Sequence, residues 1–132
     1  MAGHYHVVVW IDHHEARIIT FNTMDSETRV VRPQHPARHL HHKANTIGDG
    51  RAASDPAYYG QVAQAIEDCG AILITGPANA KNALRDHIER ETPQLVHRIV
   101  GIETMDHPTD GELLDHARCY FAAADRMQPQ LG

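Results

Sequence analysis

The stretch His6–Phe21, HVVVWIDHHEARIITF, decides the fold. Apolar residues occupy both alternating positions of 6–12, which is typical of a central strand covered on both faces. The polar break that follows is short, and the β-rich run at 16–21 predicts a second strand joined to the first as a hairpin. After a turn at 22–26, the residues 27–32 predict a third, more exposed strand. The chain therefore opens with a predicted antiparallel meander.

The second half of the sequence alternates helical and strand patterns. Helix starts are indicated by an Asp cap followed by proline at Asp55-Pro56 and by a Thr-x-x-Glu capping box at 109–112. Short continuous apolar runs at 71–75 and within 95–103 are typical of buried strands. The expected order is β-β-β-α-β-α-β-α. It predicts an α/β fold with a mixed five-stranded sheet and helices packed on it.

Size and charge set limits on the function. A chain of 132 residues with 42% hydrophobic and 22% charged residues predicts one globular domain, 1–132, with a long His-rich loop at 34–55. The net charge of −5 argues against a globally basic nucleic-acid binder, so any such contact must be local. Twelve histidines move this charge toward neutral in mild acid, because imidazole titrates near pH 6.5.

The cysteines and the N-terminal region indicate the compartment. Cys69 and Cys119 are expected to be packed thiols rather than a disulfide or activated nucleophiles. The apolar run near the N-terminus is too short for a membrane span or a secretory signal. We therefore expect a cytoplasmic protein without a membrane partner.

The loop 34–55 has the composition of an RNA contact. Its basic side chains would meet phosphates, and its imidazole rings would stack on unpaired bases. The candidates in the loop are Arg38, His39, His41, His42, Lys43 and Arg51. The simpler alternative is a solvated loop that binds nothing.

The same loop carries a second hypothesis, a divalent metal site. His39 and His41 are two residues apart, so on an extended segment both can point the same way. A further ligand would come from His35, or from His13 or His14 on the first hairpin turn. Zinc sites use such imidazoles, but neither an HExxH motif nor paired cysteines are present. The sequence thus predicts no cofactor, with a metal at His39, His41 and His13 as the alternative.

Carboxylates near the predicted strand ends raise the hypothesis of a metal-dependent phosphodiester hydrolase. Nucleases of the ribonuclease H type hold two magnesium ions on such groups. The relevant residues are Asp12, Glu15, Glu103 and Asp106. Their spacing gives no recognisable acidic triad, and an Asp that leaves a strand more often accepts backbone N–H groups in a turn. We favour the turn for Asp12.

Lys81 follows Gly76-Pro77, where a helix is expected to begin directly after a buried strand. Free N–H groups and the helix dipole favour an anion at such a helix start. Lys81 is therefore a further candidate for a phosphate or RNA contact. The alternative is an ordinary strand-to-helix turn with a lysine that faces solvent.

Several of these motifs resemble the middle domain of the archaeal and eukaryotic class 1 peptide-release factors and of pelota. The resemblance rests on 9–12 and 16–18 as the opening hairpin, on 72–77 with Lys81, and less distinctively on 102–104. The segment Asp106–Gly111 is similar to one in a group of small bacterial proteins related to this domain. The resemblance implies a ribonuclease H-like fold and a protein of the translation machinery.

One departure from the release factors bears on activity. In the release factors that the chain resembles, the loop after the third strand carries a Gly-Gly-Gln tripeptide that promotes peptidyl-tRNA hydrolysis. Here that loop contains Gly48 and Gly50, and neither is followed by Gln. Pelota also lacks the tripeptide and still acts at the ribosome. The sequence therefore predicts a non-catalytic protein whose partner is the ribosome or structured RNA, with self-association left open.

Overall fold

The computed structural model describes residues 5–33 and 56–127, and it places five strands in one mixed sheet. The order across the sheet is β3-β2-β1-β4-β5. The strands are β1 (His6–Ile11), β2 (Ala16–Phe21), β3 (Ser26–Val31), β4 (Ala71–Gly76) and β5 (Ile99–Thr104). β1, β2 and β3 pair antiparallel, whereas β4 and β5 continue the sheet in parallel from β1. The predicted α/β fold with a mixed five-stranded sheet is confirmed.

Both hairpin turns of the meander are held by a side chain with an amide or carboxylate oxygen. The Oδ1 atom of Asp12 accepts hydrogen bonds from the backbone N–H groups of His14 (2.7 Å) and Glu15 (2.9 Å). Asn22 repeats the arrangement in the second turn, with the N–H groups two and three residues later. In such turns a side-chain oxygen accepts the hydrogen bonds of turn N–H groups, in place of a backbone carbonyl. The turn interpretation of Asp12 is thus confirmed.

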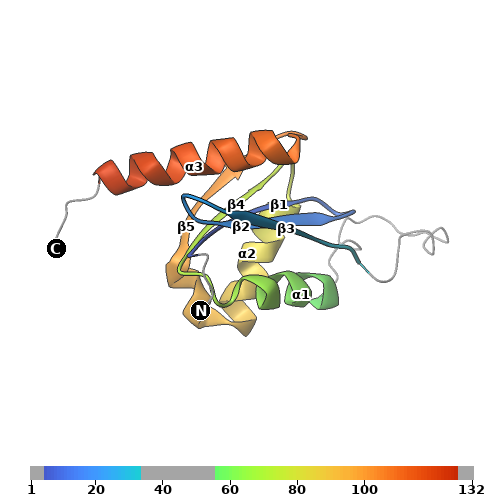
Figure 1. Cartoon of the computed structure of the whole chain (residues 1–132). Helices are drawn as coiled ribbons and strands as arrows, with labels where there is room; N and C mark the ends of the chain where they lie inside the picture. Colours follow the sequence, from blue (N-terminus) through green and yellow to red (C-terminus); the bar gives the residue numbers. More distant parts are fainter. Residues whose placement is uncertain (1–4, 34–55, 128–132) are drawn as a thin grey trace.

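Three α-helices cover the two faces of the sheet (Figure 1). They are α1 (Pro56–Ile66), α2 (Ala80–Glu91) and α3 (Asp110–Met127). The helices α1 and α2 lie on one face, and α3 crosses the opposite face. None of the helices in the described parts combines the length and the apolar character that crossing a bilayer requires.

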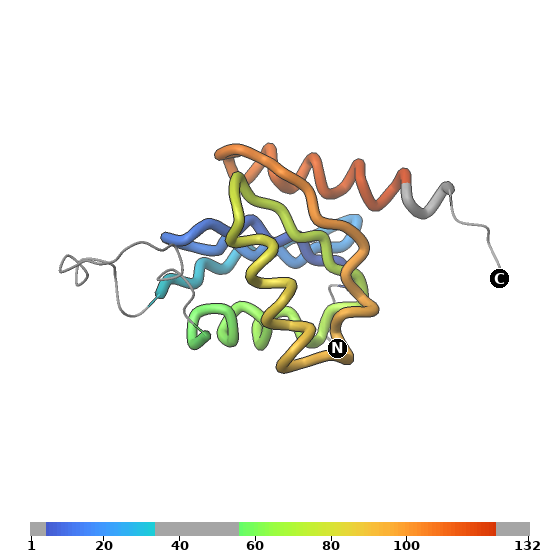
Figure 2. Tube along the Cα trace, turned by 180° about the vertical axis from the view of Figure 1, so that it is seen from behind, coloured from blue at the N-terminus to red at the C-terminus, as the bar shows by residue number. Residues whose placement is uncertain are grey.

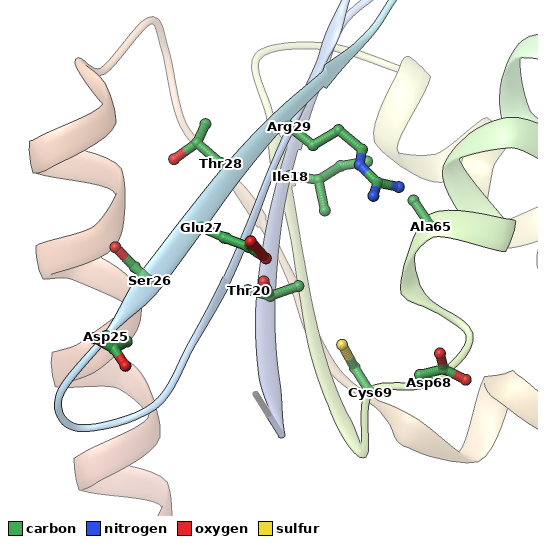
Figure 3. A pocket seen from close by; sticks show the side chains of 10 residues that line it. All are labelled: Ile18, Thr20, Asp25, Ser26, Glu27, Thr28, Arg29, Ala65, Asp68 and Cys69. Atoms are coloured by element: carbon green, nitrogen blue, oxygen red, sulfur yellow. The ribbon is translucent and has the colours of Figure 1, made fainter. Parts of the chain in front are cut away.

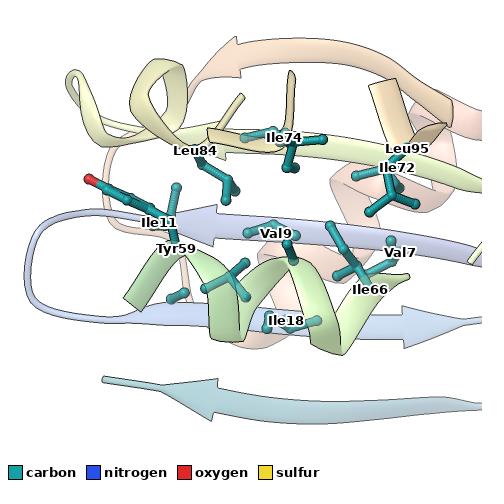
Figure 4. Packing of buried hydrophobic residues seen from close by; sticks show 14 of the residues in the cluster. Val7, Val9, Ile11, Ile18, Tyr59, Ile66, Ile72, Ile74, Leu84 and Leu95 are labelled. Carbon is teal, nitrogen blue, oxygen red and sulfur yellow. The ribbon is translucent and has the colours of Figure 1, made fainter. Parts of the chain in front are cut away.

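Alternating side chains of β1 divide the core between the two faces. Val7, Val9 and Ile11 pack with α1 and α2, as Figure 4 shows for the cluster around them. Val8 and Trp10 point to the other face and pack with α3. This explains why the first strand is apolar at both alternating positions, since each position meets a helical layer.

Two details differ from the sequence expectations. The segment 95–103 contains a strand as expected, β5 from Ile99, but a 3-10 helix that the sequence did not predict, η4 (Pro93–Arg98), precedes it. Cys69 is buried, and burial raises the pKa of its thiol, as expected of a packed cysteine. Cys119, in contrast, is exposed on α3, so its assignment as a packed thiol is wrong.

A groove between α1 and α2 contains a buried imidazole. The groove has a volume of about 690 Å³ and is lined by Gly60 and Ala63 of α1 and by His87 and Glu91 of α2. Only 7% of His87 is exposed, and its ring lies 6.1 Å from that of Tyr59. Burial lowers the pKa of His87, outweighing the nearby Glu91 carboxylate, which acts in the opposite direction.

This burial predicts a loss of stability in mild acid. The unfolded chain binds a proton at His87 as the pH falls through about 6.5, while the folded protein still holds the ring neutral. The folded state therefore binds fewer protons, and its free energy of unfolding decreases below that pH. We expect His87→Gln to lose less stability than the wild type between pH 7.5 and 5.5 in urea titrations. Equal losses in both proteins would contradict the assignment.

Candidate functional site

The carboxyl ends of four strands meet at one edge of the sheet. Because β3 runs parallel to β1, both end at the same edge as β4 and β5. Ligand sites of open α/β sheets lie outside this carboxyl edge. The three α-helices also begin at this edge. Residues 33 and 56, which bound the segment 34–55, lie there as well (Figure 2). We call this region the carboxyl edge.

An indole and an imidazole lie together at the carboxyl edge. Trp10, at the end of β1, is buried, and its Nε1–H donates to the carbonyl groups of Met105 (3.1 Å) and Asp106 (2.7 Å). The ring of His107 packs 4.9 Å from the indole, centre to centre. Its Nε2 is 3.7 Å from Oδ2 of Asp12, an ion pair when the imidazole is protonated. The chain after β5 is thereby attached to the end of β1.

A charged network continues from this pair toward β3. The guanidinium of Arg17 lies 4.6 Å above the Trp10 ring and donates to Asp110 Oδ1 at 3.0 Å, at the start of α3. Its Nε is 3.7 Å from Glu15, and the same carboxylate accepts from Arg32 at 3.1 Å. The two cations of this network, Arg17 and Arg32, are thus neutralised by the carboxylates of Glu15 and Asp110.

The carboxylates do not assemble into a metal centre in the part of the chain that the structure describes. No group of three His, Cys, Asp or Glu residues there is placed to hold an ion. Asp12 is occupied by its turn, and Glu103 instead contacts Nε2 of His116 on α3 at 2.6 Å. Asp106 contacts the imidazole of the neighbouring His107 at 3.4 Å. The described residues therefore provide nothing that favours the hydrolase hypothesis.

Lys81 also lies near the carboxyl edge, in the first turn of α2, but it does not face solvent. Only 8% of the residue is exposed, and its Nζ donates to the carbonyl of Ala78. The interpretation of a solvent-facing lysine is therefore wrong. Because the ammonium is turned back onto the preceding chain, an anion would have to approach it from the small exposed part.

The other predicted site residues divide into two groups. His13 and His14 are exposed on the first hairpin turn, next to Asp12. The remaining candidates lie outside the described residues: Arg38, His39, His41, His42, Lys43 and Arg51, with His35. The metal site at His39, His41 and His13 and the RNA contact therefore remain predictions. Residues 33 and 56, which bound the segment that carries most of these candidates, lie at the carboxyl edge.

The sequence did not indicate the roles of Arg17 and His107. Arg17 is one polar position in a predicted strand, and His107 is one of twelve histidines. The capping box at 109–112 was recognisable and is confirmed, since Thr109 and Glu112 exchange hydrogen bonds of 2.9 and 3.1 Å. That box fixes the start of α3, and with it the Asp110 carboxylate that receives Arg17. The sequence therefore located the carboxylate that Arg17 contacts, but not the contact itself.

No protein-family model and no curated protein matches the sequence. Solved structures do match it. Pelota of Archaeoglobus fulgidus superposes with a TM-score of 0.60 at 14% identity, over 86% of this chain and 30% of that one. The archaeal translation termination factor aRF1 gives 0.59 at 10% identity, over 92% of this chain and 38% of that one.

The third comparison is S. cerevisiae Dom34, a translation termination-like factor involved in RNA quality control. It matches with a TM-score of 0.58 at 8% identity, over 91% of this chain and 34% of that one. At these identities the likeness shows the shared fold, which is that of the pelota and aRF1 middle domain. The chain spans about a third of the length of the structures that it matches.

Proposed function

We propose that this protein acts in translation as a non-catalytic factor that contacts ribosomal or transfer RNA from its carboxyl edge. The observation that carries the proposal is the position of the segment 34–55. It follows β3 in the fold of the pelota and aRF1 middle domain. By the resemblance, this is the position at which release factors carry their functional loop. The proposal places the protein in the cytoplasm.

The distribution of charge along the chain also supports RNA binding at the segment 34–55. The described parts of the chain are acidic overall, and several of their arginines, Arg32, Arg85 and Arg98, have an acidic or carbonyl partner. The segment 34–55 has the opposite balance, with three basic residues, two acidic residues and four histidines. A polyanion would therefore be repelled by most of the body and attracted only to this segment. The lack of a Gly-Gly-Gln tripeptide in it supports binding without peptide release.

The test is filter binding of the full chain to ribosomal RNA fragments at two salt concentrations. Arg38→Ala/Lys43→Ala removes two cations that are proposed to bind phosphates. We expect weaker binding and a salt dependence flattened by about one unit of log slope for each cation removed. The matched control is Arg85→Ala/Arg90→Ala on α2, which removes the same charge away from the segment and should bind like the wild type. Indistinguishable binding by all three proteins would refute the proposal.

A further inference from the structure

β3 is an edge strand whose outer side has no neighbouring strand among the described residues. Five of its six residues are exposed, and its sequence SETRVV contains no proline. Its pairing with β2 is continuous from Ala16↔Val31 to Phe21↔Ser26, with no bulge. Proline and bulges are the usual devices that prevent an edge from pairing with another chain. This edge lacks both, so its geometry is suited to accept another strand.

The second turn determines which backbone groups of β3 face outward. The N–H of Asn22 donates to the carbonyl of Asp25 at 3.0 Å, so these two residues form a hydrogen-bonded pair. Hydrogen-bonded and non-hydrogen-bonded pairs alternate along an antiparallel ladder, and this register is unbroken. It follows that the residues whose N–H and C=O groups point away from β2 are Ser26, Thr28 and Val30.

The side chains of β3 carry one charge of each sign on one face. Glu27 and Arg29 project toward the α1 side, while Ser26 and Thr28 point to the opposite side (Figure 3). They border an open cavity of about 600 Å³ between β3 and α1. Neither charge has an ion-pair partner among the described residues. Two unpaired opposite charges, two residues apart on an edge, are complementary to a copy of themselves.

We propose that two copies of this chain pair antiparallel through β3, with Thr28 facing Thr28 of the second copy. This register sets Glu27 of each copy opposite Arg29 of the other, which gives two cross-strand ion pairs. The outward residues meet one another in hydrogen-bonded positions, so the two sheets join into one. A twofold axis midway between the two Thr28 residues makes the contact isologous, the commonest form of homodimer.

Other registers are less favourable. A centre at Glu27 or Arg29 would require backbone groups that already bond to β2. A centre at Ser26 keeps the backbone match but sets Glu27 opposite Asp25, so two carboxylates face each other. The centre at Thr28 satisfies the backbone and the charges together, and in it the charged pairs take the non-hydrogen-bonded positions, where side chains are closest.

The pairing also covers apolar surface on the other face of β3, the face that carries Ser26 and Thr28. Val30 is 42% exposed, one of the few large apolar side chains of the described parts that are open to water. In the proposed register it lies beside Ser26 of the second copy, so the partner strand covers part of its surface. The inference does not depend on RNA binding, because the proposed pairing uses only the residues of β3.

The first test is sedimentation equilibrium of the full chain over a wide concentration range, without RNA. We expect a reversible monomer–dimer equilibrium. Thr28→Pro removes an outward N–H and leaves the ladder with β2 intact, so it should weaken dimerisation by about tenfold or more while the protein stays folded. Thr28→Val, which keeps that N–H, is the matched control and should dimerise like the wild type.

Charge exchange then tests the register. Glu27→Lys and Arg29→Glu each place like charges opposite each other twice, and each variant alone should dimerise about tenfold more weakly or worse. An equimolar mixture of the two should form a heterodimer, and the double variant Glu27→Lys/Arg29→Glu should regain self-association. A monomeric wild type at all concentrations would overturn the proposal. So would a dimer insensitive to these changes, because it would use another surface.

Discussion

Gly76→Ala is expected to destabilise the protein by about 3 kcal/mol or more, at or beyond the upper end of the range for overpacked cores. Gly76 ends β4, where the chain passes close to the end of β1. A Cβ atom at this position would lie 2.3 Å from the backbone oxygen of Ile11. Because the clashing atom belongs to the backbone of a central strand, no rotamer change relieves it. The two strands themselves would have to separate at the carboxyl edge.

The matched control is Gly111→Ala in the first turn of α3. There an added Cβ would meet nothing closer than Thr109 Oγ1, at 4.0 Å. Alanine in a helix is favoured over glycine by about 0.5–1 kcal/mol, so this variant should be neutral or slightly more stable. Urea or thermal unfolding of both variants measures the difference. Similar stabilities for the two would show that β1 and β4 do not approach as described.

Replacing Trp10 is expected to have the second large effect. Only 1% of the residue is exposed, and its indole N–H satisfies two carbonyl groups of the chain after β5. Trp10→Ala should cost about 3–5 kcal/mol, as for other large-to-small changes of buried aromatic residues. Trp10→Phe keeps most of the packing but leaves the two carbonyls without their donor. It should cost about 1–3 kcal/mol.

The two Trp10 variants separate packing from hydrogen bonding when their urea unfolding curves are compared. Met24→Ala, at a position that is 83% exposed, serves as the reference and should change stability by no more than about 0.5 kcal/mol. If Trp10→Phe were as stable as the wild type, the attachment of the chain after β5 to β1 would not depend on the indole N–H. If Trp10→Ala were equally stable, the buried position itself would be wrong.

The fold was largely predictable because its signals are local. The meander depends on β-rich runs separated by short polar turns, and the last helix on a capping box, both of which are visible in a few consecutive residues. The same local information did not separate η4 from the strand that follows it, because the apolar residues from Leu95 onward are also typical of a strand. Pro93 at the start of η4 was the available indication that a helical turn precedes the strand.

The candidate site was less predictable because it joins distant parts of the chain. The contact between Asp12 and His107 and the contact between Arg17 and Asp110 each bridge the first hairpin and the residues after β5. No sequence spacing encodes such pairs. Cys119 illustrates a smaller error. The inward positions of α3 follow Leu113, Ala117 and Phe121, and a residue two positions from Ala117 falls on the other side of the helix.

Trp10 also gives this protein an intrinsic optical probe. The sequence contains a single tryptophan, so all indole fluorescence arises from one place, at the end of β1. Its environment includes the His107 ring, the Arg17 guanidinium and the chain that leads into α3. A ligand that displaces any of these changes the emission wavelength or intensity. Binding near residues 33 and 56, which bound the segment 34–55, can therefore be followed in the unlabelled protein, without a reporter group added to the segment itself.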